Sequence, residues 1–309
     1  MKRQYFSPEQ DGFYGVYYSN PTSSSQAMIA MLGDSSDDHM VKSGAKWLQK
    51  RGCNVMAMSP DKKDYGHHDY PLERIGRAMA FLKSHGNQKV GIVGASTTGM
   101  MALVAAFFFP DITLSIAMTP PDFIMEGFYR EKKDCADEWP SDGSSLTWQG
   151  QPLPYLPYAY RHPQYWQQVM ADSKASGDKI ASRPMFEESE RLHPVREEEK
   201  IKVETIRGKV VFVGAEDDVL WDTCKYIRRM LARLEELPHD CAVEALLYEH
   251  GTHFVFPESM LKIMLPLGSG LLVRFMFQAA RKYPEECRQT RLDIDEKLSH
   301  TILEWCRES

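Results

Sequence analysis

The sequence predicts an α/β fold in which helices cover both faces of a mostly parallel, doubly wound sheet. Short apolar segments alternate with amphipathic ones from residue 26 to residue 118 and again from residue 209 to residue 248. This alternation of strand and helix patterns is typical of such sheets. In addition, a serine flanked by glycines follows one of the predicted strands, and ligands gather at strand ends in these folds.

The first half of the chain supplies most of the predicted sheet. A short alternating piece at 13–18 is expected to be an edge strand, and buried strands are expected at 26–32, 53–58, 90–93 and 112–118. A helix is expected at 40–50, because the acids of the turn at 33–38 can cap its start. A second helix is expected from Pro71 to about His85, with apolar residues at helical spacing.

Residues 119–206 interrupt the alternation with prolines, aromatic residues and a charged, helix-like piece at 186–202. A loop of this length without its own structure is uncommon, so we interpret the segment as a cap-like insertion over the strand ends. A surface excursion away from the site is the alternative. Strands at 209–213 and 242–248 then resume the pattern. The sequence thus predicts one domain over 1–309, with helices at 223–237, 271–280 and 292–305.

Composition narrows the class of protein. The chain is 43 % hydrophobic and 26 % charged with a net charge of -6, which is ordinary for a soluble globular protein and does not favour nucleic acid or an anionic membrane as partner. No signal peptide or membrane-spanning run is visible, and the six cysteines form no C-x-x-C pair. We therefore expect a cytoplasmic protein with reduced thiols and with no cofactor or metal, and its oligomeric state stays open.

The segment 94–99, Gly-Ala-Ser-Thr-Thr-Gly, lies between the predicted strand at 90–93 and an Ala- and Met-rich helix. A serine at such a strand-to-helix turn is how an α/β-hydrolase presents its nucleophile, in the pattern G-x-S-x-G. Ser96 is the candidate nucleophile. Thr98 departs from the pattern, because it places a Cβ where helix and strand must approach closely. The alternatives are a phosphate-binding turn and a scaffold that has lost its chemistry.

An acid and a histidine follow later strands in the order that α/β-hydrolases use. Asp217 and Asp218 come after the strand at 209–213, and His250 and His253 come after the strand at 242–248. Separately, the acids are explained by helix capping, and the histidines by a surface pair or half of a metal site. Together with Ser96 they predict a Ser-His-Asp triad on an α/β-hydrolase fold, with either acid and either histidine still open.

The oxyanion hole of this fold uses the amide after the nucleophile and a second amide after the first main strand. Thr97 is the candidate for the first donor. The loop that begins Gly33-Asp34 holds the second, and the sequence does not distinguish Gly33, Asp34 and Ser35. The adjacent histidines at 67 and 68 are interpreted as loop residues.

Four segments resemble the C-terminal domain shared by acyl-CoA thioesterases and bile acid-CoA:amino acid N-acyltransferases: 94–99, 144–154, 206–221, and 251–254 with Pro257 just after. The Asp-Asp-x-x-Trp piece that ends at Trp221 is the most specific. The resemblance implies a small-molecule acyl substrate, cleaved at an ester or thioester bond through an acyl-enzyme. It also implies Asp218 as the acid, with Asp217 as the alternative, and His253 as the base.

Two departures from this family narrow the expected activity. About 25 residues precede the first core strand, so we expect the family's N-terminal β-sandwich to be absent. The amino-acid transferases use a cysteine nucleophile, whereas this chain has Ser96, and this favours hydrolysis over transfer. Carboxylesterase, dienelactone-hydrolase-like and peptidase activities at the same site remain alternatives, because a fold does not fix its substrate.

Overall fold

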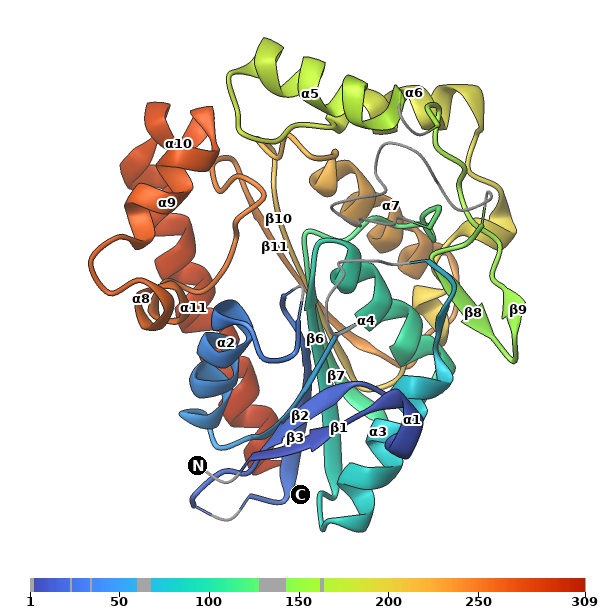
Figure 1. Ribbon diagram of the computed structural model, residues 1–309, viewed down its shortest axis with the longest axis vertical. Coiled ribbons are helices and arrows are strands. Elements are labelled where there is room, and N and C mark those ends of the chain that lie inside the picture. Colours follow the sequence, from blue (N-terminus) through green and yellow to red (C-terminus); the bar gives the residue numbers. More distant parts are fainter. Residues whose placement is uncertain are drawn as a thin grey trace.

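A computed structural model describes residues 3–22, 24–33, 35–59, 68–127, 143–161 and 164–308. An eight-stranded sheet crosses the molecule in the order β1-β2-β4-β3-β6-β7-β10-β11 (Figure 1). The strands from β4 to β11 are paired in parallel, whereas β1 and β2 are paired antiparallel. Their bounds in chain order are β1 Arg3–Phe6, β2 Gly15–Tyr18, β3 Gln26–Met31, β4 Asn54–Met58, β6 Lys89–Ala95, β7 Ile112–Met118, β10 Lys209–Ala215 and β11 Ala242–Tyr248.

Helices cover both faces of this sheet, which confirms the predicted fold class. The first face carries α3 Glu73–Ser84, α4 Thr97–Phe108 and α7 Thr223–Glu236, and the second carries α2 His39–Gln49, α8 Glu258–Met264, α9 Ser269–Met276, α10 Gln278–Lys282 and α11 Pro284–Arg307. Alternate residues of a strand point to opposite faces. Ile29 accordingly packs on the first face, and Met28 and Ala30 pack on the second.

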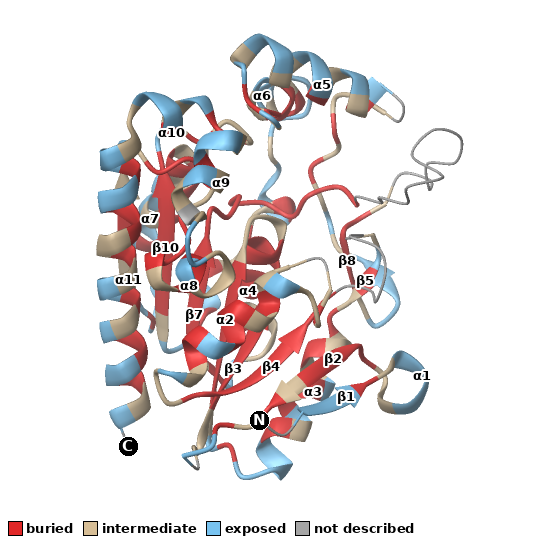
Figure 2. Cartoon of the chain, turned by 60° about the vertical axis from the view of Figure 1, so that its left-hand side comes forward, coloured by how far each residue is buried: buried red, intermediate tan, exposed pale blue. Residues whose placement is uncertain are grey.

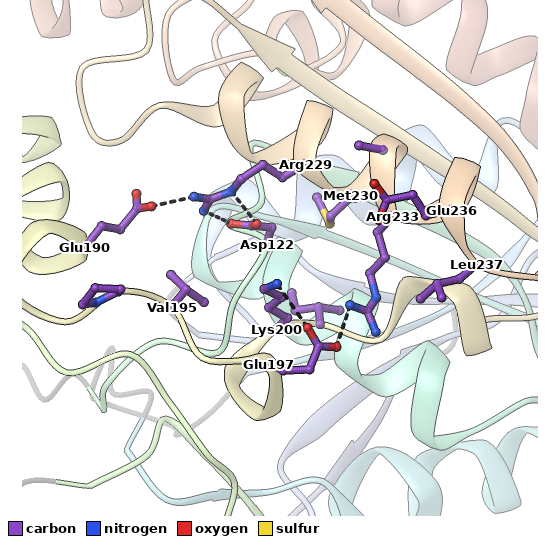
Figure 3. Close-up of a pocket in the computed structure, with 13 residues that line it drawn as sticks. Asp122, Glu190, Val195, Glu197, Lys200, Arg229, Met230, Arg233, Glu236 and Leu237 are labelled. Carbon is purple, nitrogen blue, oxygen red and sulfur yellow. Dashed lines mark hydrogen bonds and ion pairs between the residues drawn. The ribbon is translucent and has the colours of Figure 1, made fainter.

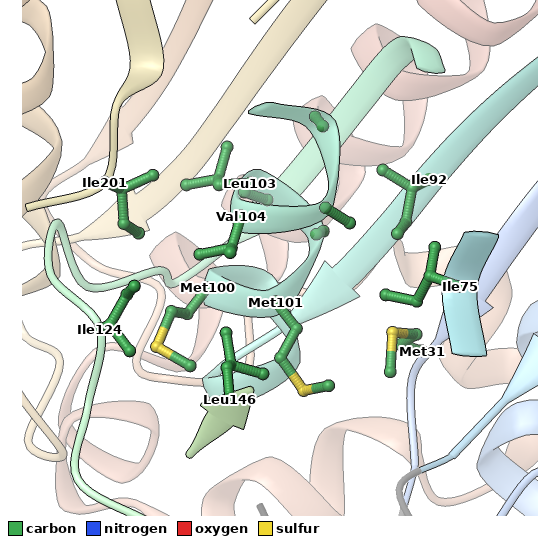
Figure 4. Packing of buried hydrophobic residues seen from close by; sticks show 14 of the residues in the cluster. Met31, Ile75, Ile92, Met100, Met101, Leu103, Val104, Ile124, Leu146 and Ile201 are labelled. Carbon is green, nitrogen blue, oxygen red and sulfur yellow. The ribbon is translucent and has the colours of Figure 1, made fainter. Parts of the chain in front are cut away.

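The helix that follows Ser96 is buried almost all round. Figure 4 shows Met100, Met101, Leu103 and Val104 of α4 between strand residues such as Ile92 and residues of other segments. The central strands are likewise buried along their length, as the red segments of Figure 2 show. A helix that is apolar on every side belongs inside a protein, so the start of α4 is held by packing on all sides.

Short elements complete the fold: α1 Pro8–Asp11, β5 Tyr70–Pro71, β8 Leu146–Trp148, β9 Gln151–Pro152, α5 Gln164–Ser176, α6 Arg183–Leu192, and the 3-10 turns Glu197–Glu199 and Val203–Thr205. β5, β8 and β9 form a separate small sheet. Helices α5 and α6 lie together at one end of the molecule in both views (Figures 1 and 2). Both come from the segment 119–206.

Three expectations about elements are wrong in detail. Residues 13–18 are not the edge of the sheet, because β1 pairs outside β2. The charged segment 186–202 is not one helix, because α6 ends at Leu192 and the residue before Pro194 disfavours helical geometry. The stretch 271–280 is divided between α9 and α10 at Phe277, which is extended at φ -127° and ψ 134°.

The cysteines within the described ranges, Cys53, Cys224, Cys241, Cys287 and Cys306, are free thiols, and Cys135 lies outside those ranges. Over the same ranges, no helix combines the length and the apolar character needed to cross a bilayer.

Candidate active site

Ser96 occupies the sharp turn between β6 and α4. Its backbone has φ 63° and ψ -131°, a region that a non-glycine residue adopts only where the surrounding structure holds it. Its amide donates to the carbonyl of Met118 at the end of β7 (2.8 Å). Glycine is required at Gly94, because a Cβ there would lie 1.9 Å from the carbonyl oxygen of Thr98. The strained turn expected of a nucleophile elbow is therefore present at Ser96.

Thr98 is accommodated in this turn rather than crowded by it. The amide of Ala95 donates to Thr98 Oγ1 (3.0 Å), and this oxygen lies 2.7 Å from the carbonyl of Ala95 and 2.5 Å from the carbonyl of Met31 at the end of β3. The side chain is 3 % exposed. The hydroxyl thus ties the turn to the neighbouring strand, and the expected conflict between Thr98 and the elbow is not observed.

Asp218 and His253 lie side by side at the ends of β10 and β11. His253 Nδ1 is 2.8 Å from Asp218 Oδ2, and both side chains are buried. Asp218 also accepts hydrogen bonds from Thr223 Oγ1 (2.5 Å) and from the amide of Leu220 (2.9 Å). A carboxylate oxygen accepts hydrogen bonds, so this contact favours the tautomer in which Nδ1 of His253 carries the proton. Nε2 of His253 is then a lone-pair nitrogen, and it is buried without a hydrogen-bond partner among the described residues.

Asp217 and His250 form a second acid–histidine contact of a different kind. Asp217 accepts the amides of Gly251 (3.0 Å) and Thr252 (2.7 Å), and its other oxygen lies 3.3 Å from His250 Nδ1. Burial raises the pKa of Asp217 despite these amides and His250. The ring of His250 stacks on Tyr283 at 3.8 Å. This pair shapes the loop before His253 and leaves Asp218 as the acid in contact with His253.

No hydrogen bond joins Ser96 Oγ to His253 Nε2 in the described part of the chain. Such bonds are often long in the absence of substrate and tighten when it binds. The edge of the Trp221 ring meets the ring of His253, with centroids 4.9 Å apart and planes at 85°. Trp221 is itself fixed by a hydrogen bond from Nε1 to the carbonyl of Thr119 (3.1 Å). The histidine ring is therefore restrained by a carboxylate at one nitrogen and by packing along its side.

Helix α6 holds the loop that carries Asp218. The amides of Ser182 and Arg183 both donate to the carbonyl of Val219 (3.0 Å each), and Ser182 Oγ donates to the carbonyl of Leu220 (2.8 Å). The guanidinium of Arg183 reaches the carbonyls of residues 216 (3.2 Å) and 218 (3.4 Å) and the carboxylate of Asp222 (2.5 Å). The start of α6 and the acid loop thus form one hydrogen-bonded unit.

The backbone amides predicted to form the oxyanion hole differ in their hydrogen bonding and position. Thr97 is the first residue of α4, so its amide has no partner within the helix. Gly33 follows β3 beside the carboxylate of Asp38, whereas Asp34 lies outside the described residues. The amide of Ser35 donates to Asp38 Oδ2 (3.3 Å), and Asp38 also caps α2. Ser35 is thereby committed elsewhere, and Gly33 and Asp34 stay predictions.

A cavity of about 140 Å³ opens at Ser96 and Thr97. Its walls come from the segment 119–206 and from the acid loop, and they are Met125, Tyr158, Tyr165, Trp166, Val169, Ile180, Ser182, Phe186, Leu220 and Trp221. Tyr165 and Val169 belong to α5, and Phe186 belongs to α6. These two helices therefore face the carboxyl end of the sheet, where the serine turn lies.

A larger cleft of about 720 Å³ lies between α6 and α7, away from Ser96 (Figure 3). Arg229 joins its two sides, with hydrogen bonds to Asp122 (2.7 Å from Nε) and Glu190 (2.6 Å from Nη1). Burial raises the pKa of Asp122. For Glu190, burial is opposed by the guanidinium of Arg229 together with the hydrogen bonds of Tyr226 and Lys225, and these contacts combined lower its pKa. Within the described residues, the cations that line this cleft are paired with carboxylates. These ion pairs link α6 and α7 and leave no unpaired lining cation for an anion there.

Within the described ranges, no three His, Cys, Asp or Glu side chains are arranged to hold a metal ion.

Two residues that contact the acid loop were not predicted from the sequence. Thr223, at the start of α7, donates to Asp218, and Arg183 fixes the acid loop. The acid-x-x-x-x-Thr spacing was a visible signal for Thr223, but nothing in the sequence indicates the backbone carbonyls that Arg183 meets.

The family model described as "BAAT / Acyl-CoA thioester hydrolase C terminal" matches residues 71–260. Among solved structures, a putative dienelactone hydrolase from Klebsiella pneumoniae is 10 % identical with a TM-score of 0.51, covering 100 % of this chain and 99 % of that one. An esterase from Pyrococcus furiosus is 13 % identical with a TM-score of 0.48, covering 87 % and 93 %. No curated protein matches significantly. The α/β-hydrolase fold predicted from the sequence is confirmed.

Proposed function

Because the chain belongs to the BAAT / acyl-CoA thioester hydrolase C-terminal family, we propose that it is a serine hydrolase that cleaves an acyl ester or thioester. The observation that carries this proposal is the state of His253. Its Nδ1 is held 2.8 Å from Asp218, and its Nε2 is buried with no hydrogen-bond partner among the described residues. A nitrogen in that state is suited to take a proton from a hydroxyl.

In the proposed reaction, Ser96 Oγ attacks the carbonyl carbon of the substrate and passes its proton to His253 Nε2. Asp218 stabilises the imidazolium that forms and keeps its tautomer fixed. Collapse of the tetrahedral adduct breaks the bond to the alcohol or thiol, which leaves with the proton from His253. Water then attacks the acyl-serine through the same base, and the free acid and Ser96 are regenerated.

The negative oxygen of the tetrahedral adduct needs donors that are already in place. The amide of Thr97 is proposed as the first donor. Its place at the start of α4, where the helix dipole favours negative charge, supports this. The loop at Gly33 and Asp34 is proposed for the second. Each such donor contributes about 3 kcal/mol to the barrier reduction.

We further propose that 1–309 is one domain and that 119–206 is its cap. The support is that α5 and α6 supply walls of the cavity at Ser96. Their buried residues also belong to the same hydrophobic cluster as those of α4 and α7. The alternative that the fold has lost its chemistry rested on Thr98. The intact turn geometry at Ser96 removes that reason.

The test is hydrolysis of p-nitrophenyl esters and of acyl-CoA by wild-type protein and by Ser96→Ala. We expect the variant to lose turnover and labelling by a fluorophosphonate while its melting temperature stays near that of wild type. Turnover by Ser96→Ala at the wild-type rate would contradict the proposal. Comparison of ester, thioester and aminoacyl amide substrates separates the thioesterase from the esterase, dienelactone-hydrolase-like and peptidase alternatives.

A further inference from the structure

We infer that the acyl group accepted at Ser96 is compact and uncharged, of the size of one benzene ring or a straight chain of about six carbons. This inference rests on the proposed function and adds a substrate class to it. It is carried by three properties of the cavity at Ser96: its volume, the rigidity of its walls and the chemistry of its lining.

The first property is volume. The cavity measures about 140 Å³. An apolar protein cavity of about 150 Å³ holds one benzene molecule. A benzoyl group or a hexanoyl chain therefore fills the space beyond the reacting carbonyl, whereas the outer carbons of a dodecanoyl chain would extend past its open side into solvent.

The second property is rigidity. Aromatic rings along the wall are packed against one another. Tyr158 meets Phe186 edge to face, with ring centroids 5.5 Å apart, and Phe186 meets Trp221 in the same way at 5.3 Å. These three rings are at most 5 % exposed. Rings that interlock in this way cannot move singly without opening a void, so the wall resists expansion around a longer chain.

The third property is the chemistry of the lining. None of the described residues that line the cavity carries a charged side chain. A carboxylate on the acyl group, as in a dicarboxylic half-ester, would lose its hydration there without gaining a cationic partner among the described lining residues. An aromatic acyl group gains edge-to-face contacts with the wall rings.

The first experiment is a series of p-nitrophenyl esters with acyl groups of two, four, six, eight and twelve carbons, together with the benzoate and the charged succinate half-ester. We expect kcat/KM to peak at four to six carbons and at benzoate. The dodecanoate and the succinate are expected to be at least about 10-fold poorer, since a misfit of a methylene or more costs about 10-fold or more. A maximum at twelve carbons, or at the succinate, overturns the inference and leaves the proposed function standing.

Substitutions of Val169 are expected to change the longest acyl chain that the cavity accepts. It lies on α5 and lines the cavity, and Val169→Ala removes two methyl groups from the wall. We expect the preferred chain to lengthen by about two carbons, and Val169→Ile to shorten it. Val211→Ala is the matched control, because Val211 is buried on the other face of the sheet. Equal chain-length profiles for Val169→Ala and Val211→Ala would contradict the assignment of the wall.

A binding measurement separates failure of this inference from failure of the proposed function. Trp166 and Trp221 line the cavity, so intrinsic fluorescence reports its occupation. Full-length Ser96→Ala is titrated with methyl benzoate and with methyl esters of four to ten carbons. We expect affinity to rise up to six carbons and to fall beyond. If wild type hydrolyses none of the esters, the proposed function fails. If the affinity of Ser96→Ala rises through ten carbons, the inferred size class fails, whether or not wild type is active.

Discussion

The hydroxyl oxygen of Thr98 lies 2.5 Å from the carbonyl oxygen of Met31. This contact connects the start of α4 with the end of β3, and the same oxygen accepts the amide of Ala95. The turn at Ser96 and the loop that begins after Met31 are thus fixed to one another. Those two segments carry the proposed nucleophile and the proposed oxyanion donors.

Thr98→Val is expected to destabilise the protein by about 1–3 kcal/mol, because a buried amide and a buried carbonyl lose their partner. Thr98→Ser keeps the hydroxyl and is the matched control, with a loss of no more than about 1 kcal/mol. Urea denaturation of both variants checks the difference. Equal stability of Thr98→Val and wild type would show that the hydroxyl is not needed in the turn.

Asp218→Asn and Asp217→Asn distinguish the two acids. We expect Asp218→Asn to lower kcat about 10³- to 10⁴-fold, because an amide in place of the carboxylate leaves the histidine without its charge partner and with the wrong tautomer. Asp217→Asn should retain activity within about 10-fold, since its contacts are to two backbone amides and His250. The measurement is kcat with p-nitrophenyl butyrate. A reversed order of the two variants assigns the orienting role to Asp217.

Arg183 is expected to act as a positioning residue through the carbonyls of the acid loop. Arg183→Ala should lower kcat about 10-fold with little change in KM, because a displacement of the acid of 1 Å or less misplaces the histidine it orients. Arg191→Ala on the same helix is the control, because Arg191 is exposed and pairs with Glu188 of α6. The alkaline and acid limbs of the pH–kcat profile should shift in Arg183→Ala alone. A loss confined to thermal stability would mean that Arg183 merely supports the helix.

Arg229→Met removes the guanidinium that pairs with both Asp122 and Glu190, and leaves Glu190 with only its contacts to Lys225 and Tyr226 among the described residues. We expect a loss of about 3 kcal/mol at pH 7. The direction in which this loss of stability changes with pH follows from the pKa values of the two carboxyl groups. In wild type the pKa of Glu190 is lowered, because Arg229, Tyr226 and Lys225 together outweigh burial. The stabilising contribution of Glu190 is therefore present above the unfolded pKa and is lost as pH falls.

In Arg229→Met we expect the pKa of both carboxyls to rise relative to wild type, because Arg229 lowers both, and acid then relieves their repulsion by protonating them. The difference in unfolding free energy between wild type and Arg229→Met should therefore shrink from pH 7 to pH 5. Urea denaturation at both values measures it. Lys225→Met is the control, because Lys225 is a more exposed partner of Glu190. A difference that grows on acidification would contradict the assignment of this network.

The sequence predicts the sheet well because strand and helix periodicities are local properties, and the strand ends then locate Ser96, the acid pair and the histidine pair. The residues alone could not choose between Asp217 and Asp218, because their side chains diverge only through the backbone of a short loop, and only the family resemblance favoured Asp218. Thr98 was expected to crowd the turn, since a side chain's volume is visible in a sequence and its hydrogen-bond partner is not. Arg183 went unnoticed for the same reason.

The shared hydrogen bonds of α6 and the acid loop set limits on protein engineering. A graft that exchanges only residues 119–206 for the corresponding segment of another hydrolase would remove the donors at Ser182 and Arg183 from Val219 and Leu220. A chimera therefore needs to import its own acid loop together with the new segment, or to keep the first turn of α6. If the exchanged segment begins after Arg183, these hydrogen bonds are kept. If the whole of 119–206 is replaced while the acid loop stays, they are lost.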